Sequence, residues 1–128
     1  MVAWADYKSH AKDRGALALE LFVVHSTPND DPEAVKASLP DHLNYQREME
    51  ESGRLVMAGP VSDDSGENMF GAGMILYRAG TMDEARAMAE NDPMHKSGAR
   101  GFTLHKWLVN EGSLNISVGL STGRASLS

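Results

Sequence analysis

The sequence contains no cysteine among its 128 residues. This absence excludes disulfide bonds, a thiolate nucleophile and metal sites built on sulfur ligands. Long apolar runs are also missing, since no stretch approaches the roughly 20 residues that a membrane-spanning helix needs. Any chemistry must therefore use oxygen or nitrogen side chains, or a bound group.

Basic residues are fewer than acidic residues. The sequence has 12 Lys and Arg and 18 Asp and Glu, which gives a formal net charge of −6. The Lys and Arg residues are scattered and form no stripe that could follow a phosphate backbone, so we expect no nucleic-acid partner. The N-terminus, with Asp6, His10 and Asp13, lacks the apolar segment of a signal peptide. We therefore expect a cytoplasmic protein with no membrane partner.

The composition is otherwise that of one ordinary domain, with 41% hydrophobic and 23% charged residues. Apolar periodicity and turn residues predict the elements of this domain. In order, they are a helix over residues 3–14, a strand over 16–26, a helix from Leu39 or Pro40 to Glu51, strands over 54–60 and 70–78, a helix that starts at Thr81, and a strand over 101–110.

After the first helix the order is β-α-β-β-α-β, which is typical of a ferredoxin-like α+β fold. In this fold a four-stranded antiparallel sheet has both helices on one face, and its other face is open to a partner. The expected inner stripe of the helix that ends at Glu51 comprises Leu39, His42, Leu43, Gln46 and Met49.

The two ends of the chain lie outside this pattern. Leu114, Ile116 and Val118 alternate with polar residues, which predicts an additional half-buried strand that could pair across a dimer interface. The small polar residues 121–128 predict a frayed tail. We therefore divide the chain into an N-terminal helical extension (1–15), a core domain (16–111) and a C-terminal strand with a flexible tail (112–128).

Two stretches, PDHLNYQREMEESGRLVMAGP and, some thirty residues later, NDPMHKSGA, resemble the YCII-like proteins. The match covers roughly residues 19 to 110. The resemblance implies a dimeric α+β barrel, related to the muconolactone isomerases, in which a His and an Asp that match His42 and Asp92 are the active pair. It also implies a small-molecule substrate, because one family member looks like a dehydrochlorinase of chlorinated hydroxyquinols.

His42 and Asp92 each have a structural interpretation as well. A histidine on an apolar helix stripe is more often a hydrogen-bonded core residue than a catalyst, and helical spacing alone favours that reading. Asp92 followed by Pro93 is a common helix start. The family resemblance favours catalysis, with His42 as the proton carrier and Asp92 as the carboxylate that orients its ring.

Other residues are weaker candidates for substrate contact. His25 and His105 lie on predicted strands, and His105 faces the open side of the sheet if Phe102 and Leu104 face the helices. Gly59 and Pro60, from the matched Ala58-Gly59-Pro60 motif, are also candidates. The remaining histidines, His10 and His95, are expected at the surface.

The spacing of the five histidines matches no metal site, so we expect no metal, and no cofactor motif is present. These observations favour a cofactor-independent lyase or isomerase that acts on a small cyclic compound. Two alternatives stay open: a non-catalytic barrel that binds a small ligand, and an oxygen-dependent ring oxidation.

Overall fold

A computed structural model describes all 128 residues of the chain, which fold as two units. One unit comprises Glu20–Leu108, and the other comprises Met1–Leu19 together with Val109–Ser128. The elements are α1 (Trp4–Asp13), β1 (Leu19–Pro28), α2 (Pro32–Glu51), β2 (Leu55–Ser62), β3 (Met69–Tyr77), α3 (Met82–Asn91), α4 (Pro93–Lys96), β4 (Arg100–Val109), β5 (Ile116–Val118) and β6 (Ala125–Leu127).

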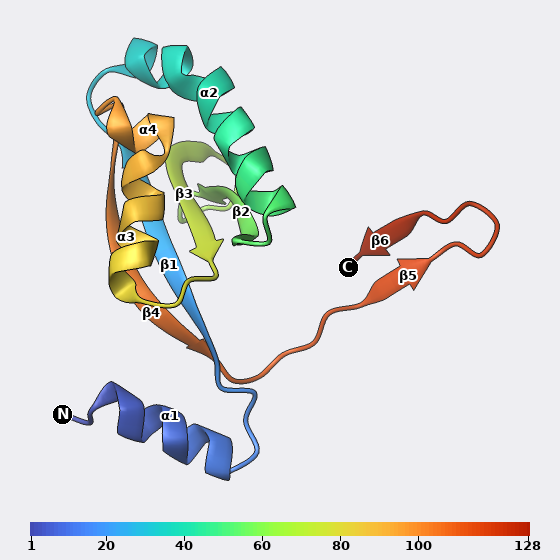
Figure 1. Cartoon of the computed structure of the whole chain (residues 1–128). Coiled ribbons are helices and arrows are strands. Elements are labelled where there is room, and N and C mark those ends of the chain that lie inside the picture. The colour runs from blue at the N-terminus through green and yellow to red at the C-terminus, as the bar shows by residue number, and fades with distance from the viewer. The chain divides into compact units, whose positions relative to one another are not determined.

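The larger unit is built on a four-stranded antiparallel sheet with the strand order β2-β3-β1-β4. Strand β3 lies between β1 and β2, so that Tyr77 is opposite both Phe22 and Leu55. Helices α2 and α3 cover one face of this sheet (Figure 1). The prediction of a ferredoxin-like α+β fold is therefore confirmed.

Side-chain alternation along the strands separates the two faces of the sheet. Facing the helices is a hydrophobic core made of Phe22, Val24, Met49, Ile75, Tyr77, Ala85, Ala89 and Leu104. Ser26 has the same parity on β1 as Phe22 and Val24, and it is also buried. The residues between them, such as His25, face the open side.

The first strand starts later than predicted, at Leu19 instead of residue 16. The reason is a turn after α1, in which Gly15 has a φ of 89° and Ala18 a φ of 50°. Both values lie in the left-handed region, which an extended strand cannot contain. The other strand bounds agree with the predictions to within two residues.

Helix α2 is longer than predicted, because it begins at Pro32 and not near Leu39 or Pro40. Asp31 is its N-cap, and the Asp31 carboxylate accepts hydrogen bonds from the backbone N–H groups of Glu33 and Ala34. Pro32 fits the first helical turn, where a missing N–H costs nothing. The helix continues through Pro40, so residues 32–38, which were not predicted to be helical, belong to it.

The inner stripe of α2 is also rotated from the predicted one. Leu39 and Leu43 are 43% and 50% exposed, so they do not face the core. The residues that do turn inward follow a spacing of three and four: Val35, Ser38, His42, Tyr45 and Met49. Of the predicted stripe, His42 and Gln46 are partly buried and Met49 is buried.

Helix α3 begins at the expected cap. The Thr81 hydroxyl accepts a hydrogen bond from the Glu84 N–H over 3.1 Å. The Glu84 carboxylate accepts from the N–H of Gly80, one residue before the position that a capping box predicts. Helix α3 ends at Asn91, and Asp92 then starts the short helix α4.

The smaller unit contains α1 and a hairpin of β5 and β6. Residues 125–127 pair with 116–118, so the prediction of a frayed tail is wrong. The predicted strand in this segment is present as β5, whose Ile116 and Val118 are 69% and 59% exposed within the chain. Its pairing across a dimer interface stays a prediction. No helix of either unit has the length and apolar character needed to cross a bilayer.

Candidate active site

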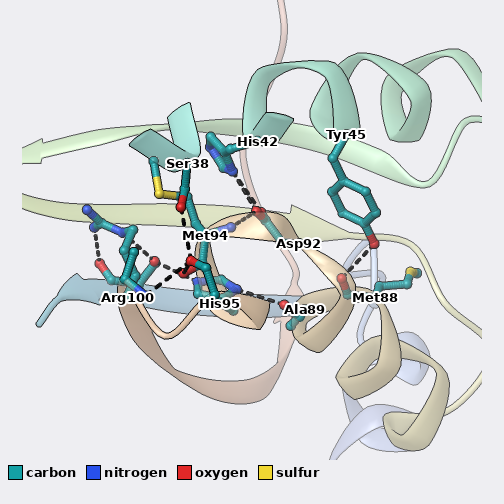
Figure 2. Close-up of polar contacts among 12 residues, drawn as sticks. Ser38, His42, Tyr45, Met88, Ala89, Asp92, Met94, His95 and Arg100 are labelled. Carbon is teal, nitrogen blue, oxygen red and sulfur yellow. Dashed lines mark hydrogen bonds and ion pairs between the residues drawn. The ribbon is translucent and has the colours of Figure 1, made fainter. Parts of the chain in front are cut away.

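The side chains of His42 and Asp92 meet on the helix-covered side of the sheet (Figure 2). His42 comes from the inner stripe of α2, and Asp92 lies at the junction between α3 and α4. The His42 Nδ1 atom is 2.7 Å from Oδ1 and 2.9 Å from Oδ2 of Asp92. Residues 50 positions apart in the sequence therefore form one close ion pair or hydrogen-bonded pair.

Asp92 is completely buried. Its carboxylate has two hydrogen-bond donors, the His42 ring and a backbone N–H group. Its Oδ1 atom accepts a hydrogen bond from the backbone N–H of Met94 over 3.0 Å, which makes Asp92 the N-cap of α4. A buried carboxylate without partners would be strongly destabilising. Asp92 thus has a structural role and contacts His42 at the same time.

The contact with Asp92 determines which nitrogen of His42 holds the proton. A carboxylate only accepts, so Nδ1 donates, and the neutral ring then has its lone pair on Nε2. The His42 side chain is 16% exposed, whereas that of Asp92 is completely buried. An imidazole whose Nδ1 donates to a buried carboxylate has the arrangement needed for a general base that acts through Nε2.

Two tyrosines lie near the pair. The Tyr45 hydroxyl donates to the Met88 carbonyl over 2.7 Å, whereas the buried Tyr77 hydroxyl has no hydrogen-bond partner. Burial raises the pKa of each phenol, and the negative charge of Asp92 raises both further. Both phenols are therefore protonated near neutral pH, and neither competes with imidazole as a base.

A second polar network lies on the same side of the sheet and links β1, α4 and β4 (Figure 2). His95 donates from Nδ1 to the Ala89 carbonyl over 2.7 Å. Its Nε2 atom accepts from the Ser26 hydroxyl over 2.8 Å, and Ser26 Oγ in turn accepts from Arg100 Nε over 2.8 Å. With these directions, the N–H and O–H donors of the three contacts each have an acceptor. His95 is then neutral and has its proton on Nδ1.

His95 is therefore not a surface residue, contrary to the prediction. It is half-buried, and its ring centroid is 4.8 Å from that of Phe102. Burial lowers the pKa of His95, although the hydrogen bond to Ala89 and the charge of Asp92 partly offset this. The alternation of residues along β1 could have predicted that Ser26 is buried on the same face as Phe22 and Val24. It could not have predicted the partners of Ser26.

The other predicted substrate contacts lie elsewhere in the unit. The rings of His25 and His105 are 6.5 Å apart and nearly perpendicular, on the open face of the sheet. His105 thus has the expected orientation, but the sheet separates both rings from His42 and Asp92 of the same chain.

Gly59 and Pro60 lie on β2, the edge strand, opposite Met74 and Gly73 of β3. Both are exposed. A shallow hollow between α2 and β2 is lined in part by Leu43 and Leu55, and neither His42 nor Asp92 lines it.

The His95 network predicts a specific dependence of stability on pH. The folded-state pKa of His95 is below the ordinary value of 6.5, so below that pH the unfolded chain binds more protons. The contribution of His95 to the free energy of unfolding is therefore complete above pH 6.5 and falls as the pH decreases. His95→Gln should flatten this decrease in urea unfolding curves measured at several pH values.

His10→Gln, at an exposed position of α1, is the matched control for the loss of one histidine. If both variants showed the same pH dependence as the wild-type protein, the neutral His95 of this network would be contradicted.

Two comparisons with known proteins agree with this fold. The model of the YCII-related domain family matches residues 20–107, which is nearly the whole larger unit. The fold is also similar to that of 5-chloro-2-hydroxyhydroquinone dehydrochlorinase (TftG) from Burkholderia phenoliruptrix, solved as a complex with 2,5-dihydroxybenzoquinone. The TM-score is 0.50 at 18% sequence identity, over 68% of this chain and 92% of the dehydrochlorinase chain.

No sequence among the curated proteins matches the chain. At 18% identity the likeness to the dehydrochlorinase shows the fold alone. The family match, in contrast, spans well over half of the sequence and contains both His42 and Asp92. The chain therefore belongs to the YCII-related domain family.

Proposed function

We propose that the protein is a cofactor-independent enzyme that transfers protons on a small cyclic or aromatic compound. His42 is the general base through Nε2, and Asp92 orients the ring and stabilises the imidazolium ion that forms. The observation that carries this proposal is the contact of 2.7 Å between His42 Nδ1 and a completely buried carboxylate.

The most concrete reaction is loss of HCl from a chlorinated hydroxyquinol, the substrate type in the name of the similar dehydrochlorinase. His42 takes a proton from one ring hydroxyl and returns it to the carbon that bears chlorine, which gives a keto tautomer. It then takes the proton of a second hydroxyl, whose electron pair forms a C=O bond. The shifted ring electrons expel chloride, so no oxidant or reductant is needed.

Isomerisation would use the same base, which would remove a proton from one atom of the ring and return it to another. The choice between the two reactions depends on whether the substrate has a leaving group. In either reaction a positioned base contributes roughly a hundredfold to ten-thousandfold to the rate.

The second candidate is a non-catalytic ligand-binding or accessory domain, in which the pair serves only the fold. The N-cap role of Asp92 at α4 favours this alternative. Asp92→Asn separates the two, because Asn caps helices as well as Asp does but cannot stabilise an imidazolium ion.

The catalytic proposal predicts that His42→Ala lowers kcat on chlorinated hydroxyquinols or muconolactones by about a hundredfold or more. Asp92→Asn should also lower kcat strongly, while the thermal unfolding midpoint changes little because the cap is kept. Turnover is measured without added metal or cofactor, and His10→Ala is the control with an exposed histidine.

No turnover in the wild-type protein, together with a loss of folding stability in both variants, would favour the accessory domain. Activity that is equal in the wild-type protein and His42→Ala would eliminate His42 as the base. Oxygen consumption during turnover would indicate ring oxidation instead.

We further propose that two copies pair through the open faces of their sheets to form a dimeric α+β barrel. Large apolar side chains on this face support the proposal, since Met57 and Trp107 are 49% and 43% exposed. In such a dimer His25 and His105 would face the barrel interior, where substrate contact is possible.

The barrel proposal predicts a dimer in sedimentation equilibrium. Met57→Lys combined with Trp107→Lys should shift the mass to that of one chain, because each charge would be buried at the interface. Leu43→Lys, at an exposed position of α2, should leave the dimer intact. A wild-type monomer, or a dimer in the double variant, would contradict the proposed interface.

A further inference from the structure

The guanidinium group of Arg100 is held firmly at the start of β4. Its Nε atom donates to Ser26 Oγ, and Nη2 donates to the backbone carbonyls of Ser26 and Gly71. Arg100 thereby connects β4 with β1 and β3. Three of its five N–H donors have acceptors on two neighbouring strands, so the orientation of the group is fixed.

The backbone around Gly71 is shaped for this contact. Gly71 has a φ of 98°, and a Cβ atom at this position would lie 2.9 Å from Cγ of Pro28. A larger residue would therefore be strained and would move the carbonyl that Arg100 contacts.

Every acceptor of Arg100 is neutral. Its partners are one hydroxyl and two carbonyl oxygens, and no carboxylate lies within ion-pair distance of the guanidinium group. The side chain of Arg100 is half-buried, and burial lowers its pKa, which the charge of Asp92 partly offsets. A buried cation normally pairs with an anion, and no anion of the chain contacts the guanidinium group of Arg100 directly.

His95, which shares the Ser26 contact with Arg100, does not supply a negative charge. His95 is neutral when its Nε2 atom accepts from Ser26, and its protonation would add a second positive charge to the network. The two N–H donors on Nη1 of Arg100 have no acceptor within the chain.

We infer that Arg100 binds the oxyanion of a small ring compound, either a carboxylate or a deprotonated ring hydroxyl, through Nη1. Arg is suited to this task because its fixed donors form strong charge-assisted hydrogen bonds with such oxygens. Arg100 lies on the same side of the sheet as His42 and Asp92 (Figure 2). Its Nε atom donates to the Ser26 hydroxyl, which is also hydrogen-bonded to His95.

The consequence for substrate choice rests on the proposed function. If His42 is the base, an anionic group held at Arg100 would anchor the substrate on the side of the sheet where His42 lies. Arg100 would then select acidic ring compounds over neutral ones. Anion binding at Arg100 itself does not require His42 to be catalytic.

The experiment measures binding of benzoate, 4-nitrophenolate and benzamide by calorimetry, and follows the Arg100 Nε–H signal by NMR. Benzoate and 4-nitrophenolate represent the two oxyanion sources, and benzamide is the neutral match to benzoate. We expect the wild-type protein and His42→Ala to bind at least one of the anions and not benzamide. Arg100→Gln should weaken anion binding by about tenfold or more, the scale of one charge-assisted contact.

Arg86→Gln, at an exposed position of α3, is the matched control for loss of one positive charge. If Arg100→Gln is too unstable to test, Arg100→Lys replaces it. This variant keeps the positive charge, so it should keep part of the anion affinity. A shift of the wild-type Arg100 Nε–H signal with either anion supports the inference without any substitution.

Three results would overturn the inference: binding of neither anion by the wild-type protein, equal anion affinity in Arg100→Gln, or an Arg100 signal that no anion moves. None of these three results tests the catalytic role of His42, which the turnover measurements test separately. Conversely, anion binding that depends on Arg100 in a protein without turnover would contradict the proposed catalysis and support this site.

Discussion

The buried carboxylate of Asp92 is the constraint on which the rest of the site depends. A carboxylate without solvent needs donors, and Asp92 has them from the Met94 backbone and from His42 Nδ1. The first contact starts α4, and the second connects α2 to the α3–α4 junction. Because one side chain does both, the packing of the helices and the orientation of the imidazole are set together.

The charge of Asp92 also affects groups that it does not contact. It raises the pKa values of Tyr45 and Tyr77 and partly offsets the effect of burial on His95 and Arg100. The site on the helix-covered side of the sheet thus contains a buried anion, Asp92, which is paired with His42, and a cation, Arg100, whose direct partners are neutral. This asymmetry is the basis for the inference that Arg100 binds an external anion.

Much of the fold could be predicted from the sequence, because strand-length apolar runs and turn residues are local signals. The order of elements and the Thr81 cap follow from such signals. The start of α2 was missed because Pro40 was read as a boundary, whereas the Asp31 cap and Pro32 begin the helix eight residues earlier. The His42–Asp92 pair came from family resemblance, while the His95 network joins residues up to 74 positions apart and has no local signal.

The central claim is that Asp92 holds His42 in the tautomer that leaves Nε2 unprotonated. Nitrogen-15 NMR of the neutral imidazole measures this directly, since protonated and unprotonated ring nitrogens have distinct shifts. We predict a protonated Nδ1 and an unprotonated Nε2 for His42 in the wild-type protein, and loss of this preference in Asp92→Ala. A proton on Nε2 in the wild-type protein would contradict the account, because His42 could not then act as the base.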